Sequence, residues 1–146
     1  MLFAQEYKVE IPEIIVDANK IYYTSTDNNS ITPYSSTAFN VTINSNAFDS
    51  SQNMFAITYS GDLTQVGSNA FRSRATLQSM YLPDSVTSIG DRAFYYCTGL
   101  TYLDCGDNLE TIGASTFSTC SALTVLKLGS KVKSIGMYGF YGCSAL

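Results

Sequence analysis

Residues 86–100 read VTSIGDRAFYYCTGL, and the same apolar positions return twice downstream at a spacing of 23 residues. Residues 109–123 read LETIGASTFSTCSAL, and residues 132–146 read VKSIGMYGFYGCSAL. Upstream, residues 63–77 keep the glycine, the phenylalanine and the leucine of this pattern but carry Arg74 in place of the cysteine. A period of about 20 to 30 residues is typical of a solenoid, in which each unit buries its apolar face against its neighbours.

Each repeat is expected to contribute two short strands and a helical corner. Residues 102–105 alternate polar and apolar side chains, as in a strand with one buried face. A second strand is expected at residues 109–112, closed by Gly113, because glycine adopts backbone angles that other residues avoid. Residues 115–120 are predicted to form the short helical corner. Equivalent strands of successive repeats would then pair as parallel ladders about 4.8 Å apart, in a β-rich solenoid.

The N-terminal part of the chain, residues 1–42, is assigned to a leader and a capping β-hairpin. Residues 7–11 alternate like a half-buried strand. Residues 21–26 are rich in β-branched and aromatic side chains, and the apolar pattern resumes at Ile31. The Asp and Asn side chains of residues 27–30 favour a hairpin turn between them, whereas a calcium loop would need further spaced carboxylates.

The solenoid is assigned to residues 43–146, with a degenerate first unit and an incomplete last unit. In the first unit, Ile43 and Phe48 are placed at the positions of Val66 and Phe71. The last unit stops at the position that opens the next strand. We therefore expect this end to be continued by more repeats or covered by another chain, since unpaired strand edges favour association.

The charge balance argues against several classes of partner. The net charge is −4 with eight Lys and Arg in 146 residues, so no basic stripe is available for nucleic acid. No apolar run approaches the roughly 18 residues of a membrane span, and the first residues lack the pattern of a signal peptide. Nucleic acid and a membrane span are therefore not expected.

The reactive residue types predict a protein without catalytic, cofactor or metal sites. The chain has no histidine, which removes the commonest general base and the Ser-His and Cys-His pairs. Cys97, Cys120 and Cys143 occupy one position of the repeat, and Cys105 takes a position filled elsewhere by leucine. Thiols in one row do not converge on a metal, and stacked neighbours lie too far apart for a disulfide. We expect four reduced cysteines in the core.

The repeat units resemble a known family. Residues 82–100, LPDSVTSIGDRAFYYCTGL, and their copies over residues 63–146 are similar to the BspA-type leucine-rich repeats of bacterial surface proteins. Residues 21–34 also resemble the segment that often precedes such repeats. The resemblance implies an extracellular or cell-surface scaffold that binds proteins or extracellular matrix, with no catalytic residues, although no signal peptide is visible in this chain.

The candidate contact surface is the outward face of the first strand ladder. The side chains expected there form two columns, Ala56, Ser79, Tyr102, Val125 and Thr58, Tyr81, Asp104, Lys127, with Gln78, Thr101 and Thr124 beside them. Tyrosine offers a large contact area and a polar tip at low entropic cost. Strand propensity alone would also select threonine and tyrosine at these places.

Three functions are consistent with these observations. The first is a protein-protein interaction or adhesion scaffold that presents the strand ladder. The second is a structural spacer or an assembly component of a larger surface or particle protein. The third is a carbohydrate-binding module that uses Tyr81 and Tyr102.

Overall fold

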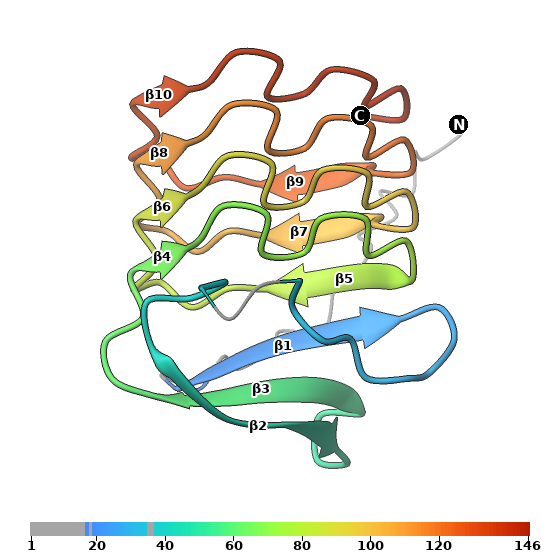
Figure 1. Ribbon diagram of the computed structural model, residues 1–146, viewed down its shortest axis with the longest axis vertical. Helices are drawn as coiled ribbons and strands as arrows, with labels where there is room; N and C mark the ends of the chain where they lie inside the picture. The colour runs from blue at the N-terminus through green and yellow to red at the C-terminus, as the bar shows by residue number, and fades with distance from the viewer. Residues whose placement is uncertain (1–16, 18, 35–36) are drawn as a thin grey trace, which may run out of the picture.

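Two stacks of short parallel strands, joined by wide turns, form the body of the molecule (Figure 1). This computed structural model describes residues 17, 19–34 and 37–146, so the strand expected at residues 7–11 lies outside the described residues. One sheet has four strands, β4 (Gln65–Val66), β6 (Ser88–Ile89), β8 (Thr111–Ile112) and β10 (Ser134–Ile135). The other has six strands, β1 (Lys20–Ser25), β2 (Thr42–Asp49), β3 (Met54–Ser60), β5 (Leu77–Tyr81), β7 (Tyr102–Asp104) and β9 (Val125–Lys127).

The parallel strands pair with an offset of one repeat, which confirms the predicted solenoid. In the four-stranded sheet, Ile89 of β6 lies opposite Val66 of β4 and Ile112 of β8. In the six-stranded sheet, Leu103 of β7 lies opposite Met80 of β5 and Leu126 of β9. Each coil of about 23 residues therefore contributes one strand to each parallel stack, and the apolar side chains between the stacks form one continuous core.

A column of phenylalanine rings runs through the core from coil to coil. The ring centroids of Phe71 and Phe94 are 5.5 Å apart, those of Phe94 and Phe117 5.5 Å, and those of Phe117 and Phe140 5.4 Å. The rings are nearly parallel, with interplanar angles of 10° to 13°. Phe71, Phe94 and Phe117 are fully buried, whereas Phe140 of the last coil is only half-buried.

The corners of the solenoid are not helical, contrary to the sequence-based expectation. We call residues 67–76, 90–99, 113–122 and 136–145 the corner segments; no helix forms there or elsewhere in the described residues. Every second amide of a corner segment donates a hydrogen bond to the next coil. The amides of Arg92, Phe94 and Tyr96 donate in this order to the carbonyls of Ala114, Thr116 and Ser118. The amides between them bond within their own segment, from Ala93 to Gly90 and from Tyr95 to Arg92.

The backbone angles explain why a helix does not form. Arg92 and Tyr96 adopt φ of 55° and 59°, and the equivalent Ser115 and Thr119 adopt φ of 54° and 63°. A left-handed residue at every fourth position interrupts an α-helix, whose residues all have negative φ. The corner segments are therefore runs of overlapping turns that form a third ladder between the coils.

The repeated glycine is required by close packing between coils. Gly90 and Gly113 do not have the positive φ that their sequence context suggested. A Cβ atom on Gly90 would lie 2.6 Å from the amide nitrogen of Ser68 in the preceding coil, and one on Gly113 would lie 2.5 Å from that of Asp91. A side chain at this position would separate the coils, so only glycine fits.

The cap of the solenoid is antiparallel and differs from the predicted hairpin of residues 21–34. β1 lies between β3 and β5 and pairs antiparallel with both, and it does not pair with the segment after Ile31. The hairpin is formed instead by β2 and β3. Ile43 and Phe48 are 40% and 55% exposed, so they do not take the buried places of Val66 and Phe71. The predicted boundary between residues 42 and 43 falls inside β2.

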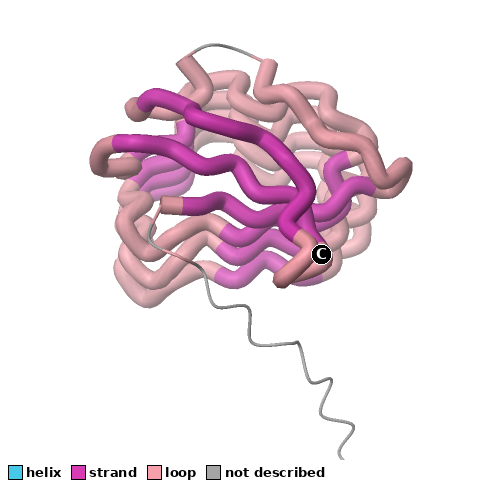
Figure 2. Tube along the Cα trace, turned by 90° about the horizontal axis from the view of Figure 1, so that it is seen from below, coloured by secondary structure: helices cyan, strands magenta, loops and turns pink. Residues whose placement is uncertain are grey.

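The strands of the cap cover the N-terminal end of the solenoid core. Seen from below, they cross the end of the stack between the two parallel ladders (Figure 2). Arg74, which stands in the cysteine column, helps to tie this end down. Its Nε donates to the carbonyl of Thr32 at 2.7 Å, and its guanidinium lies over the ring of Tyr34. Arg74 thus links the first coil to Thr32 and Tyr34 of the preceding segment.

Cys97, Cys120 and Cys143 form a row of thiols that donate hydrogen bonds to the preceding coil. The Sγ of Cys97 donates to the carbonyl of Phe71 at 3.0 Å, that of Cys120 to Phe94 at 3.1 Å, and that of Cys143 to Phe117 at 3.0 Å. All four cysteines are free, and Cys97, Cys105 and Cys120 are buried. Burial raises the pKa of the Cys97 thiol to about 12 and raises the pKa values of the other three thiols as well.

Truncation of the phenylalanine column should be costly. Phe117→Ala removes a ring stacked on both sides, and we expect a loss of about 3–5 kcal/mol in the free energy of unfolding. Phe48→Ala, a truncation of the same size at an exposed ring, should cost less than about 1 kcal/mol. Urea denaturation followed by circular dichroism measures both values. Equal losses for the two variants would contradict the stacked core.

The thiol row predicts slow alkylation of the folded protein. At pH 8 we expect Cys143, which is half-buried, to react first, and all four thiols to react in denaturant without added reductant. Mass spectrometry after alkylation counts the thiols. Fewer than four in the denatured, non-reduced protein would reveal a disulfide.

The buried Cys97 thiol also makes stability depend on pH. Its neutral form contributes stability that is fully present below the unfolded-state pKa of about 8.5 and is lost as pH rises from there towards 12.

Candidate functional site

The outward face of the six-stranded sheet presents the side chains that the sequence pattern places there. We define the outward sheet face by six residues of β5, β7 and β9, namely Ser79, Tyr81, Tyr102, Asp104, Val125 and Lys127. The strand register sets Ser79, Tyr102 and Val125 in one row across the strands and Tyr81, Asp104 and Lys127 in the next. Their alternation with the buried Met80 and Leu103 follows from the two-residue period of a strand.

Two tyrosine rings form the centre of this face. Tyr81 and Tyr102 are diagonal neighbours with ring centroids 5.2 Å apart and an interplanar angle of 35°. Both side chains are half-buried. Partial burial raises the pKa values of both hydroxyls, and the nearby Asp104 carboxylate raises them further. The hydroxyls therefore stay protonated at neutral pH, where they can donate hydrogen bonds to a ligand.

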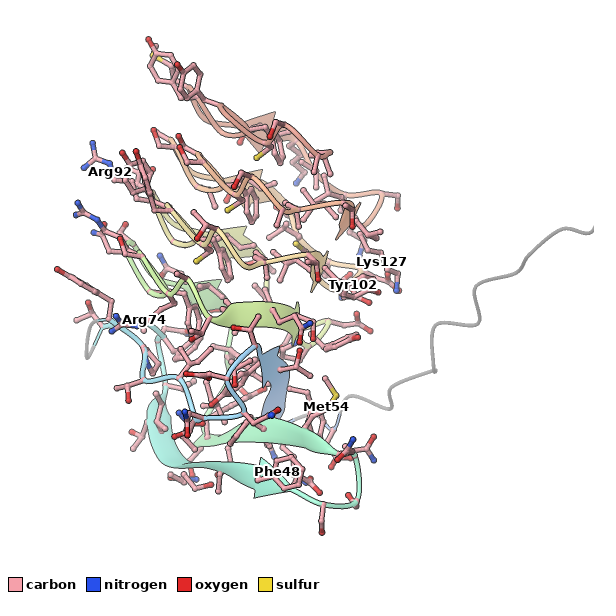
Figure 3. The ribbon with its side chains drawn as sticks, turned by 90° about the vertical axis from the view of Figure 1, so that its right-hand side faces the viewer. Phe48, Met54, Arg74, Arg92, Tyr102 and Lys127 are labelled. Carbon is pink, nitrogen blue, oxygen red and sulfur yellow. The ribbon has the colours of Figure 1, made fainter. Side chains whose placement is uncertain are left out.

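An ion pair and an apolar side chain border the tyrosines. The Nζ of Lys127 lies 2.9 Å from Oδ2 of Asp104, and this contact raises the pKa of Lys127. Side-chain exposure is 59% for Lys127 and 18% for Asp104, so the ammonium remains available to a partner. Val125, 43% exposed, adds an apolar contact. In Figure 3, Tyr102 and Lys127 lie together at one edge of the stack.

The three polar residues predicted beside this face contribute less to it. The Oγ1 of Thr101 donates to the carbonyl of Gln78 at 3.0 Å, and that of Thr124 donates to the carbonyl of Thr101 at 3.1 Å. These hydroxyls thus connect successive coils. The Oε1 of Gln78 accepts a long hydrogen bond, 3.4 Å, from Thr24. We therefore regard this column as part of the scaffold that supports the outward sheet face.

The predicted columns are wrong at their N-terminal end, because β1 is inserted between β3 and β5. Tyr22 of β1 lies opposite both Ala56 and Tyr81, so Ala56 and Thr58 do not adjoin β5. Thr24 bonds to Ser79, with 2.7 Å between their hydroxyl oxygens. Tyr22 is 1% exposed and packs with Met54, Ala56 and Tyr81.

Thr24 is the contributor to this surface that sequence reasoning missed, and the buried Tyr22 supports Tyr81 from the side. A signal was present in the alternation of Lys20–Ser25, which has outward positions at Tyr22 and Thr24. The pairing of β1 with strands distant in the sequence could not be read from that alternation alone. The row of Tyr81, Asp104 and Lys127 therefore continues into the cap at Tyr22, whose side chain is buried.

The described residues offer no alternative metal centre. Within residues 17, 19–34 and 37–146, no group of three or more cysteine or carboxylate side chains is placed to hold a metal ion. The cysteine thiols have raised pKa values and lie in the core, which disfavours them as nucleophiles. Nor does the described part of the chain include a helix long and apolar enough to cross a membrane.

Comparison with known proteins identifies a repeat family. Residues 18–146 match the BspA type leucine rich repeat region, in six copies. No curated protein sequence matches the chain.

Three solved structures share this kind of repeat. A leucine-rich repeat protein of T. pallidum is 23% identical, with a TM-score of 0.46 over 79% of this chain and 69% of that chain. One from Bacteroides capillosus ATCC 29799 is 23% identical, with a TM-score of 0.41 over 84% and 96%. A leucine rich cell surface protein of Faecalibacterium prausnitzii A2-165 is 26% identical, with a TM-score of 0.43 over 68% and 32%.

Proposed function

The chain belongs to the BspA-type leucine-rich repeat family, and from this premise we propose that it is a non-catalytic scaffold whose outward sheet face docks a protein partner. Leucine-rich repeat proteins are generally protein-interaction scaffolds. The single observation that carries the proposal is the contact pair of Tyr81 and Tyr102 beside the exposed Lys127 ammonium.

The chemistry of this face suits a protein interface. Tyrosine is enriched at the energetic centres of interfaces, because its ring buries a large area while its hydroxyl stays hydrogen-bonded. Tyr81 and Tyr102 are already half-buried and hold each other in place, so they lose little side-chain entropy when a partner binds. Lys127 and Asp104 at the border would favour a partner with complementary charges and fix its register.

The family also suggests the cellular location of the interaction. BspA-type repeat proteins are typically bacterial surface proteins, and we extend that location to this chain as part of the proposal. The partner would then be another surface protein or a protein of the extracellular matrix.

The binding proposal differs from the spacer alternative in a measurable way. Immobilised matrix-protein fragments without glycans should retain the chain, and Tyr102→Ala should weaken the complex about 30-fold, the effect of losing a hot-spot side chain of about 2 kcal/mol. Phe48→Ala, an aromatic truncation on β2 away from this face, should bind like the parent. Surface plasmon resonance gives the affinities.

The folded state of each variant is checked by its melting temperature. A spacer would bind no fragment, and its truncation at Tyr102 would change no interaction. Retention of the chain with equal affinities for the parent and the Tyr102→Ala variant would place the contact elsewhere on the molecule.

A further inference from the structure

A groove opens on the corner side of the solenoid, at the opposite edge from the outward sheet face. In Figure 3, Arg74 and Arg92 project at this edge, and Tyr102 and Lys127 lie at the other. The groove has a volume of about 680 Å³. Its lining comes from four successive corner segments and consists of Arg72, Arg92, Tyr95, Tyr96, Ser115, Ser118, Thr119, Tyr138 and Tyr141.

The groove results from one missing aromatic ring in an outward column. Tyr95, Ser118 and Tyr141 occupy the same position of three successive coils, 23 residues apart. The buried phenylalanine column shows that rings on adjacent coils stack with centroids 5.4–5.5 Å apart. Ser118 interrupts such a stack and is 5% exposed, so it forms the floor between Tyr95 and Tyr141, whose backbones stand two coils apart, roughly 10 Å.

The two walls of the groove are tyrosine pairs set at steep angles. Tyr95 and Tyr96 have ring centroids 4.7 Å apart and an interplanar angle of 57°. Tyr138 and Tyr141 are 6.1 Å apart at 84°. Each wall therefore offers both a ring face and a hydroxyl-bearing edge. Such walls suit a sugar, which has C–H faces for the rings and a rim of hydroxyls for the tyrosine edges.

The charge of the groove is positive, although the chain carries a net charge of −4. All three arginines of the sequence lie in corner segments, and two of them line the groove without any acidic side chain. Among the described residues, no carboxylate lies within ion-pair distance of Arg72 or Arg92. The guanidinium of Arg72 lies 5.6 Å from the ring centroid of Tyr95, whereas Arg92 has a free guanidinium in the described structure. An arginine fork binds a carboxylate through two hydrogen bonds.

The backbone conformation of the groove lining does not favour the large side chains found there. Arg92, Tyr96 and Tyr138 adopt φ of 55°, 59° and 60°, and Gly142 at the position equivalent to Tyr96 adopts φ of 76°. Glycine takes this conformation without strain, so large side chains at these positions are not explained by the backbone.

We propose that this groove binds an acidic saccharide. One sugar ring fills the place of the missing aromatic between Tyr95 and Tyr141, and its carboxylate pairs with Arg92. The floor of Ser115, Ser118 and Thr119 supplies hydroxyls for the ring substituents. This site is independent of the outward sheet face, which lies at the opposite edge of the solenoid.

The test compares carboxylated sugars with their neutral counterparts. Trigalacturonate and sialyllactose are titrated into the full chain, and fully methyl-esterified trigalacturonate and lactose serve as matched neutral probes. Isothermal titration calorimetry at low salt should give a dissociation constant below about 1 mM for at least one carboxylated probe. The neutral counterpart should bind at least ten-fold more weakly, because it lacks the charge that pairs with Arg92.

Two variants locate the binding. Ser118→Tyr completes the outward stack and fills the groove, so it should weaken binding at least ten-fold without lowering the melting temperature. Ser121→Tyr adds the same ring at an exposed position of the same corner segment and should bind like the parent. Should Ser118→Tyr fail to fold, Arg92→Gln provides the loss of the charge contact with no change in packing.

Four results would overturn the proposal. They are no binding of either carboxylated probe at millimolar concentration, equal affinity for charged and neutral probes, and unchanged affinity in folded Ser118→Tyr or Arg92→Gln. The fourth is tighter binding of a phosphotyrosine peptide, which would reassign the groove to a protein ligand.

Discussion

The structure depends on hydrogen bonds between coils, because the parallel strands of a coil have their pairing partners only in the neighbouring coils. Three ladders connect each coil to the next: the two stacks of parallel strands and the alternate amides of the corner segments. Buried amide and carbonyl groups without partners are costly, so the coils must keep one fixed offset along the whole stack. The 23-residue period is the sequence consequence of that offset.

This constraint selects the repeated side chains. Gly90 and its equivalents leave no room for a Cβ against the preceding coil. Cys97 and Cys120 are small enough to sit in the core while each thiol donates to a carbonyl of that coil. Phe94 and Phe117 stack because the fixed offset places equivalent rings of successive coils side by side, with centroids 5.5 Å apart. Side chains that point outward are not restricted by this packing. The same register aligns them in columns that are available for ligand binding, such as Tyr95, Ser118 and Tyr141.

Structural features that follow the 23-residue repeat can largely be predicted from the sequence, whereas the pairing of the cap strands cannot. The parallel ladders, the phenylalanine column and the outward positions of Tyr81 and Tyr102 follow from a pattern copied at one spacing. The helical corner was wrong because the left-handed residues there include Arg92 and Tyr96, whose types give no sign of positive φ. The insertion of β1 beside β5 is a long-range antiparallel pairing that no local pattern encodes. The groove was missed although its signal, Ser118 between two tyrosines at 23-residue spacing, is visible in the sequence.

Amide hydrogen exchange at the corner segments tests the coil-to-coil ladders most directly. Phe94 and Phe117 donate their amides to the next coil, whereas the amide of Thr98, exposed in the same corner segment as Phe94, has no acceptor among the described residues. The ladder predicts slow exchange at Phe94 and Phe117, close to the rate of global unfolding, and fast exchange at Thr98. Equally fast exchange at all three amides would contradict the ladder, and so would equal protection of all three.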